Sequence, residues 1–291
     1  MNELIVVTGA STGMGAATAK ELARKGFHVL AGVRREADAD ALAAEGIEPC
    51  TLDITVDSDI AAIAERVAND SRPLRALINN AGIAINAPIE TLPLPEWRQQ
   101  FEVNLFGHIA MTQALLPALL SSAGTVVNIS SVGGKVVLPT YGAYAGSKFA
   151  LEAFSDALRR EVAKFGIKVV VVEPGAVKTQ MVERGLATAD RLKAAMTAGQ
   201  LDRYGDLAEA VAAQAESFTE TGVSAEHAAK VIARAATSSR PRTRYTIGRD
   251  AAILLRVAQV VPDRVLDRII LADLRSRYAK RSTRDAAVSS R

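Results

Sequence analysis

Up to Gly175, short apolar runs alternate with longer segments in which apolar residues recur at helical spacing. The short runs are rich in β-branched residues and predict strands at 4–7, 27–33, 48–52, 74–78, 124–129 and 167–172. The longer segments predict helices at 16–25, 38–45, 58–69, 95–120 and 142–164, the fourth interrupted at Gly107 and Pro117. This alternation predicts an α/β fold, a Rossmann-type doubly wound parallel sheet with helices on both faces.

The pattern is looser after Ala176. Helices are expected at 188–198, 207–218 and 225–237, an edge strand at 244–247, and further amphipathic helix at 251–277, divided by Pro262. We interpret residues 1–291 as one domain with a core of about 1–180 plus 225–250. Residues 181–224 and 251–281 form a substrate lid or helical extension, and a polar tail at 282–291 is expected to be disordered.

Composition narrows the functional classes. The chain has 291 residues, of which 49% are hydrophobic and 23% charged, as in soluble globular proteins. A net charge of +3 gives no argument for nucleic acid, and the basic residues gathered after Asp263 are either a solvated tail or a contact for an acidic surface. A single cysteine, Cys50, and three scattered histidines predict neither a disulfide nor a metal site. Without a charged leader or an apolar run of membrane-spanning length, we expect a cytoplasmic protein.

A glycine-rich turn directly follows the first strand. Thr8-Gly9-Ala10-Ser11-Thr12-Gly13-Met14-Gly15 lies between that strand and the first helix. Glycines allow the backbone to approach a pyrophosphate, and a helix N-terminus offers free N–H groups and a positive dipole end. The strand, turn and helix together predict a dinucleotide site.

Polar residues follow the next strands at the same predicted edge. The second strand ends in Arg34 and Arg35, where a carboxylate would favour NAD(H), so the arginines favour NADP(H). Asp53 is expected either to accept a bond from the adenine amine or to cap its own turn. Asn79 and Asn80 have amides suited to tying loop backbones together.

The segment Tyr144-Ala145-Gly146-Ser147-Lys148 places a phenol and an amine four residues apart, on one face of the predicted helix. A lysine ammonium there is expected to lower the tyrosine pKa and prepare the phenol for proton transfer. Ser131 rather than Ser130 is expected to face this pair, because side chains alternate at a strand end. Asn104, among apolar neighbours, must find buried partners.

Together these motifs resemble the short-chain dehydrogenase/reductase family, closely over about residues 4–180. The resemblance implies that Tyr144 is the general acid/base, that Lys148 lowers its pKa and binds the nicotinamide ribose, and that Ser131 holds the substrate oxygen. Asn104 would anchor a water that links Lys148 to solvent, and Thr179 would bond the carboxamide. The implied cofactor residues are Gly9, Ser11, Thr12, Gly13, Met14, Gly15, Arg34, Arg35, Asp53, Ile54, Asn80, Ala81, Gly82, Tyr144, Lys148, Pro174, Gly175, Val177 and Thr179.

The function that follows is hydride transfer between NADP(H) and a secondary alcohol, ketone or aldehyde. The candidate substrate residues Ser131, Leu138, Tyr141, Tyr144 and Val182, with Ile83, Val132 and Val177, are mostly apolar and suggest a hydrophobic substrate. The stretch 134–161 also resembles the retinol, hydroxysteroid and hydroxybutyrate branches of the family. An NAD-dependent dehydrogenase of a small polar compound and a non-catalytic cofactor sensor are the alternatives. We expect a homodimer or homotetramer, with the C-terminal helices as lid, subunit contact or, less favoured, membrane contact.

Overall fold

The structure is a computed structural model, and residues 3–288 of it are described. Within that range, seven parallel strands form one sheet in the order β3-β2-β1-β4-β5-β6-β7. The strands are β1 (Leu4–Val7), β2 (His28–Val33), β3 (Ile47–Thr51), β4 (Leu74–Asn79), β5 (Thr125–Ile129), β6 (Lys168–Pro174) and β7 (Arg244–Ile247). The central strands are buried on both faces, which explains their continuous apolar runs. The predicted fold class is confirmed.

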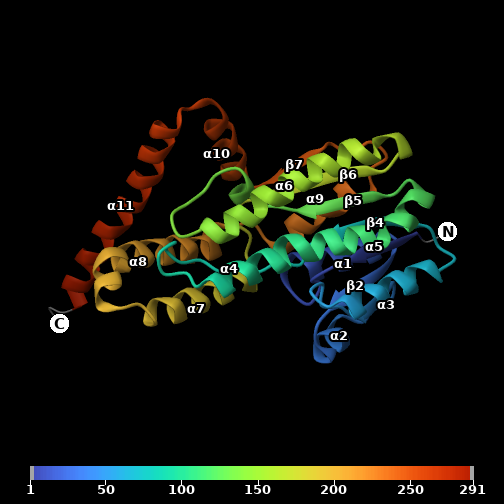
Figure 1. Ribbon diagram of the computed structural model, residues 1–291, viewed down its shortest axis with the longest axis horizontal. Coiled ribbons are helices and arrows are strands. Elements are labelled where there is room, and N and C mark those ends of the chain that lie inside the picture. Colours follow the sequence, from blue (N-terminus) through green and yellow to red (C-terminus); the bar gives the residue numbers. More distant parts are fainter. Residues whose placement is uncertain (1–2, 289–291) are drawn as a thin grey trace.

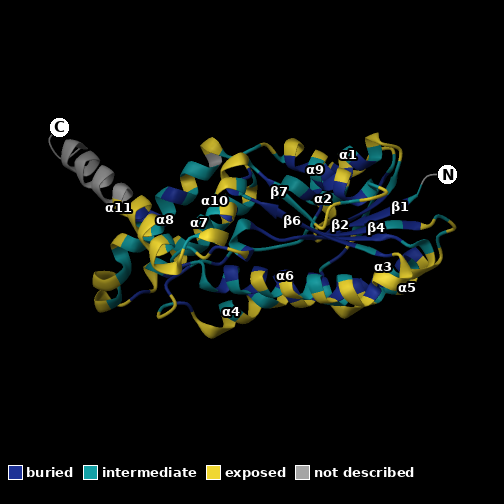
Figure 2. Ribbon diagram, turned by 90° about the horizontal axis from the view of Figure 1, so that it is seen from above, coloured by how far each residue is buried: buried dark blue, intermediate teal, exposed yellow. Residues whose placement is uncertain are grey.

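Helices cover both faces of the sheet (Figure 2). One face carries α1 (Gly13–Arg24), α2 (Glu36–Leu42) and α9 (Ala225–Thr237), which share an apolar core with that side of the strands. The other face carries α3 (Asp57–Ala68), α5 (Gly107–Ser122) and α6 (Gly142–Val162) around a second core. The sheet therefore stabilises the site through two independent apolar layers.

Four helices lie beyond the carboxyl ends of the strands (Figure 1). They are α7 (Gln180–Ala194), α8 (Ala198–Thr221), α10 (Arg249–Val260) and α11 (Asp263–Val288). Between β4 and β5 the chain forms α4 (Leu94–Phe101) and a π-helical turn, η1 (Glu102–Phe106), before α5, and two short 3₁₀ turns are η2 (Val132–Gly134) and η3 (Ala163–Phe165). The helix α11 includes part of the tail for which disorder was expected, and residues 289–291 lie outside the described residues.

The bounds predicted for the helix at 188–198 are wrong. Helix α7 begins eight residues earlier, at Gln180, and ends at Ala194, while α8 begins at Ala198 and includes the predicted helix at 207–218. A capping box fixes the start of α8. The Thr197 hydroxyl accepts from the Gln200 N–H, and the Gln200 side chain accepts from the Thr197 N–H.

Pro117 does not interrupt its helix, contrary to the prediction. Helix α5 continues through it, and both Pro117 and Gln113, whose carbonyl loses its helical partner, are exposed to solvent. The irregularity lies earlier, in η1, immediately before Gly107. The continuous helical stretch Leu94–Ser122 is also long and apolar enough to span a membrane by length and composition, so the expectation that no such run exists is wrong. Through α5 this stretch packs on one face of the sheet, where its apolar side chains join the core.

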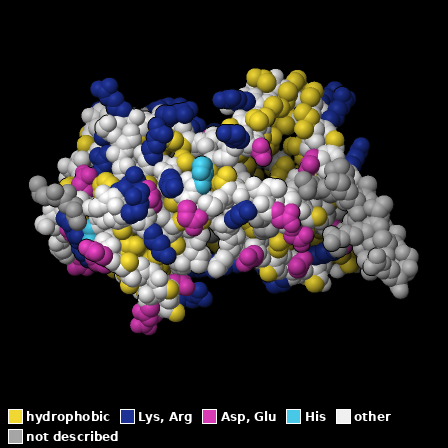
Figure 3. Space-filling model, turned by 180° about the vertical axis from the view of Figure 1, so that it is seen from behind, with side chains coloured by type: hydrophobic (Ala, Val, Ile, Leu, Met, Phe, Trp, Pro, Cys, Tyr) yellow, Lys and Arg dark blue, Asp and Glu magenta, His cyan; other side chains and the backbone are white. Residues whose placement is uncertain are grey.

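Exposed apolar side chains gather at the end of the molecule formed by α10 and α11, with Lys and Arg beside them (Figure 3). The large exposed apolar residues of these two helices are Ile253, Val260, Val265, Ile269 and Leu271. On its inner side α11 packs Leu274 against Ala210 and Val211 of α8. The expected subunit or membrane contact of this segment stays a prediction.

Candidate active site

Two adjoining cavities lie at the carboxyl edge of the sheet. The larger measures about 1040 Å³ and the smaller about 400 Å³, and Met14, Thr179 and Met181 line both. They lie where β1 is flanked by β2 on one side and β4 on the other, so the chain crosses over at this point. Crevices at such switch points are the usual ligand sites of open parallel sheets.

The glycine turn after β1 is closed by backbone contacts that leave no room for side chains. Gly9 has a φ of +64°, and a Cβ there would lie 2.7 Å from the Ala81 Cα. A Cβ on Gly15 would lie 2.2 Å from the Gly9 carbonyl oxygen. The Asn80 side chain fixes the turn by donating to the carbonyls of Thr8 (2.9 Å) and Gly9 (3.0 Å). Asn80 therefore ties loop backbones together, as predicted.

The turn delivers the N-terminus of α1 to the smaller cavity. The Thr12 side chain makes no cap hydrogen bond, so the first turn of the helix offers its N–H groups to a ligand. A cradle of this shape fits a dinucleotide pyrophosphate. The predicted cofactor residues that line this cavity are Gly9, Ser11, Thr12, Gly13, Met14, Gly15, Arg34, Asp53, Ile54, Asn80, Ala81, Gly82 and Thr179.

The two arginines after β2 separate. Arg34 lines the smaller cavity, whereas Arg35 is not among its lining residues and forms a bidentate pair with Asp38, at 2.7 and 2.8 Å. The pairing follows from i,i+3 spacing at the start of α2. It lowers the pKa of Asp38, with smaller contributions from Ser11 and Arg184. The role predicted for Arg35 in binding the cofactor stays a prediction, and its pair with Asp38 would have to open for it.

Asp53 caps its own turn. Its Oδ1 accepts from the N–H of Thr55 (3.0 Å) and from the Thr55 hydroxyl (2.7 Å). Of the two alternatives left open, the structure shows the cap, although the residue also lines the smaller cavity.

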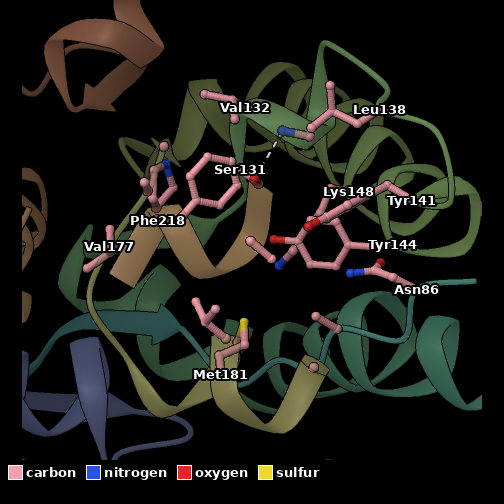
Figure 4. Close-up of a pocket in the computed structure, with 18 of the residues that line it drawn as sticks. Asn86, Ser131, Val132, Leu138, Tyr141, Tyr144, Lys148, Val177, Met181 and Phe218 are labelled. Carbon is pink, nitrogen blue, oxygen red and sulfur yellow. Dashed lines mark hydrogen bonds between the residues drawn. The ribbon is translucent and has the colours of Figure 1, made fainter. Parts of the chain in front are cut away.

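Helix α6 brings Tyr144 to Ser131, which follows β5 (Figure 4). A Cβ on Gly133 would lie 3.1 Å from the Tyr144 ring and 3.4 Å from the Ser131 Oγ, so both groups border the same space. Ser131 Oγ accepts from the Gly133 N–H at 3.0 Å. The Ser130 Oγ is buried and has no hydrogen-bond partner among the described residues. The geometry agrees with the choice of Ser131.

Burial dominates the electrostatics of the pair. It raises the pKa of Tyr144, against a hydrogen bond with Ser131 that lowers it, and it lowers the pKa of Lys148 to about 8, which Glu152 partly opposes. The Lys148 Nζ donates to the Ile129 carbonyl at 2.8 Å and lies 6.0 Å from the centre of the Tyr144 ring. The expected lowering of the Tyr144 pKa by Lys148 is therefore not seen in this geometry.

Asn104 lies fully buried on the π-helical turn η1. Its Oδ1 accepts from the Ile83 N–H (2.9 Å), and its Nδ2 donates to the Ile83 carbonyl (3.0 Å) and to Ser147 Oγ (3.3 Å). A π turn shifts the helical register and is frequent at functional sites. The Asn104 amide therefore has the buried partners that were expected: the backbone of the loop at Ile83 and Ser147 on the helix that carries Tyr144.

A profile of the short chain dehydrogenases matches residues 3–190 of the chain. The chain belongs to the short-chain dehydrogenase family. It is 34% identical to the "Uncharacterized oxidoreductase YbbO" of Escherichia coli over 272 residues, 93% of this chain and 94% of that protein. It is 33% identical to the "NADPH-dependent 3-dehydrocapnine reductase" of Ornithobacterium rhinotracheale over 282 residues, 93% of this chain and 96% of that protein.

A vertebrate relative and a solved structure agree with this assignment. The chain is 33% identical to "Retinol dehydrogenase 7" of Mus musculus over 280 residues, 92% of this chain and 88% of that protein. A crystal structure of a short-chain dehydrogenase from Streptomyces avermitilis has a TM-score of 0.74 and 28% identity, with 97% of this chain and 98% of that chain covered. This short-chain dehydrogenase is thus an oxidoreductase of a family that uses nicotinamide cofactors.

The larger cavity of this short-chain dehydrogenase is mostly apolar. The predicted residues that line it are Met14, Asn80, Gly82, Ile83, Ser131, Val132, Leu138, Tyr141, Tyr144, Lys148, Pro174, Gly175, Val177, Thr179 and Val182. Tyr141 packs edge-to-face on Tyr144 with ring centres 6.1 Å apart, and burial raises its pKa to about 12. Tyr141 thus lies at the cavity wall beside Tyr144, as predicted.

Sequence reasoning missed a second set of lining residues, contributed by the loop after β4 and by α7, α8 and α10. They include Asn86, Met181, Val211, Ala212, Phe218 and Leu254, and Met196 joins them from the connection between α7 and α8. The sequence predicted a helix at 207–218 within α8, but no pattern in it indicated which side chains would face a cavity. Gln100 was also missed: its side chain accepts from the Ile85 N–H and donates to the Ile83 carbonyl, both at 2.8 Å.

Proposed function

We propose that this short-chain dehydrogenase transfers hydride between NADP(H) and a hydrophobic secondary alcohol or its ketone, or the corresponding aldehyde. One observation carries the proposal: the Tyr144 phenol and the Ser131 hydroxyl border a cavity of about 1040 Å³ whose other walls are largely apolar. A polar reacting group placed at one wall of an apolar cavity suits a substrate with one carbonyl and a long or bulky hydrocarbon part.

The cofactor would be held by the parts of the smaller cavity. The glycine turn and the N-terminus of α1 would bind the pyrophosphate, and Arg34 the adenosine 2′-phosphate. Lys148, which lines the larger cavity, would bind the nicotinamide ribose. When bound, NADP(H) supplies or accepts the hydride. Arg34 and the NADPH-dependent 3-dehydrocapnine reductase among the relatives support NADP(H).

The protein moves the proton. Because burial raises the pKa of Tyr144, the phenol is protonated near neutral pH and donates to the substrate oxygen during reduction. Ser131 holds that oxygen against Tyr144. Lys148, with a pKa of about 8, is still mostly charged near neutral pH and stabilises the phenolate that the transfer leaves.

The substrate class rests on shape and on relatives. The lining of the larger cavity by α7, α8 and α10 extends well beyond the space that a small polar hydroxy compound needs. Retinol dehydrogenase 7 among the relatives agrees with an apolar substrate. The NAD-dependent alternative has one observation in its favour, because the Asp38 carboxylate interacts with Ser11 on the glycine turn.

The test combines a substrate screen with one substitution. Apolar ketones, aldehydes and alcohols are assayed with NADPH and with NADH, and we expect faster turnover of the apolar compounds with NADPH. Tyr144→Phe should reduce kcat by about 10²- to 10⁴-fold and leave NADPH affinity within about twofold. Tyr204→Phe, on α8 and outside the lining of both cavities, is the matched control and should retain activity. Near-normal turnover of Tyr144→Phe would refute the proposed role.

A further inference from the structure

A cluster of charged side chains lies directly behind the candidate active site. Glu152 Oε2 accepts from the Arg244 guanidinium (2.9 and 3.1 Å) and pairs with Lys135 Nζ (3.0 Å). Arg244 also contacts Asp156 (3.0 Å) and Glu173 (3.5 Å). Glu152 therefore lies at the centre of the cluster.

The Glu152 carboxylate is buried, so its charge is little screened by water. Glu152 is 4% exposed, and its Oε1 has no hydrogen-bond partner among the described residues. Its other oxygen carries both cations of the cluster. A buried carboxylate is costly unless nearby cations compensate its charge, so the cations around Glu152 are part of what keeps it ionised. Lys148 lies one helical turn before it on α6.

Few other charges face Lys148. His108 on α5 is fully buried and its pKa falls to about 3, so it is neutral beside the lysine at working pH. Tyr144 on α6 is neutral as well, because burial raises its pKa. Glu152 is thus the anionic group that acts on Lys148, and it opposes the effect of burial on that lysine.

The cluster also joins the elements that carry the site. Lys135 follows η2, the turn that begins directly after Ser131. Glu173 precedes Pro174 at the end of β6 and accepts from Thr246, which lines the larger cavity.

The loop and the helix pack without space between them. A Cβ on Gly134 would lie 2.6 Å from the Ser130 Oγ and 3.2 Å from the Glu152 Cγ. Glu152 therefore lies directly against the loop that follows Ser131.

We propose that Glu152 is a positioning residue that keeps Lys148 charged and holds the Ser131 loop against α6, for the reaction proposed above. Lys135 and Arg244 neutralise its second oxygen and anchor it from two further elements. Glu152 is not among the lining residues of either cavity, so it acts through Lys148 and the loop.

The test measures the ionisation of Lys148 directly. Side-chain NMR of isotope-labelled lysine, with the Lys148 signal assigned by its loss in Lys148→Met, gives its pKa without any substrate. In Glu152→Gln the side chain keeps its shape and loses its charge, so the Lys148 pKa should fall by about one unit. The pH profile of NADPH-dependent kcat should then lose its high-pH limb about one unit earlier, with roughly tenfold lower turnover near pH 8.5 and little change near pH 6.

Three further variants make the outcome decisive. Glu152→Asp should restore both values. Asp156→Asn, which removes another Arg244 partner one turn further from Lys148, should leave them unchanged. Lys135→Gln removes a positive charge beside Glu152 and should raise the Lys148 pKa, the opposite of the change expected for Glu152→Gln. It therefore tests the same interaction should Glu152→Gln fail to fold.

An unchanged Lys148 pKa in Glu152→Gln would overturn the proposal, even if turnover fell. A wild-type enzyme without NADPH-dependent turnover would instead contradict the proposed function, while the NMR titration would still decide the role of Glu152.

Discussion

At the scale of single residues, Arg34 and Arg35 show how local spacing divides two identical side chains. Arg35 stands three residues before Asp38 at the start of α2 and is held there by a bidentate pair. Arg34 has no such partner among the described residues and lines the smaller cavity. The position of both arginines after β2 was predictable from the sequence. The pair of Arg35 with Asp38, which competes with ligand binding, depends on where α2 begins and was not predictable.

Arg34→Ala should therefore discriminate between the cofactors. Loss of a charge-assisted contact with the 2′-phosphate is expected to weaken NADPH binding by roughly 10- to 100-fold. NADH lacks that phosphate, so its affinity should change by less than about threefold. Fluorescence titration of both cofactors measures this, with Arg35→Ala as the adjacent control. Equal losses for NADPH and NADH would show that Arg34 does not bind the 2′-phosphate.

At the scale of elements, α4 and η1 hold the loop after β4 by two side-chain amides. Asn104 binds both backbone groups of Ile83, and Gln100 binds Ile83 and Ile85. Asn104 was predictable because it belongs to a family motif in a constant order. Gln100 gives no such signal, since a lone glutamine in an amphipathic helix usually faces water and becomes buried only through the loop that packs on it.

Gln100→Ala should destabilise the fold and loosen the loop after β4, which Gln100 holds at Ile83 and Ile85. It leaves the Ile85 N–H and the Ile83 carbonyl with one partner fewer in a buried setting, at a cost of about 1–3 kcal/mol. Thermal unfolding measures the loss, and KM for an apolar ketone should rise because Ile83 lines the larger cavity. Gln99→Ala, the exposed neighbour, should change the free energy of unfolding by less than about 0.5 kcal/mol. Similar melting temperatures for the two variants would contradict this reading.

At the scale of the whole molecule, the structure of the sheet and its flanking helices can be predicted from the sequence better than that of the helices beyond the carboxyl ends of the strands. The strands read as continuous apolar runs because both faces of the sheet are covered, and the glycine turn, Ser131, Tyr144 and Lys148 follow at strand ends or on the next helix. The helices α7 and α8 are rich in alanine and charge, which gives helical propensity without a clear apolar face. Their boundaries depend on the Thr197 capping box and on packing around the larger cavity, which no local pattern encodes.

The role of this C-terminal layer can be tested by reducing the space that it encloses. Ala212 of α8 lines the larger cavity, whereas its neighbour Ala213 does not. Ala212→Phe should occupy the place of two or three substrate methylene groups, each worth about 0.8 kcal/mol of burial.

KM for a long-chain ketone should then rise roughly 10- to 100-fold, while a short ketone, which reaches Tyr144 without touching α8, should be affected less than about threefold. Ala213→Phe controls for the bulk added to the helix, and the comparison is made by steady-state kinetics on a series of ketones of increasing chain length. If both variants shifted KM equally at every chain length, α8 would not contact the substrate, and the cavity would serve another ligand.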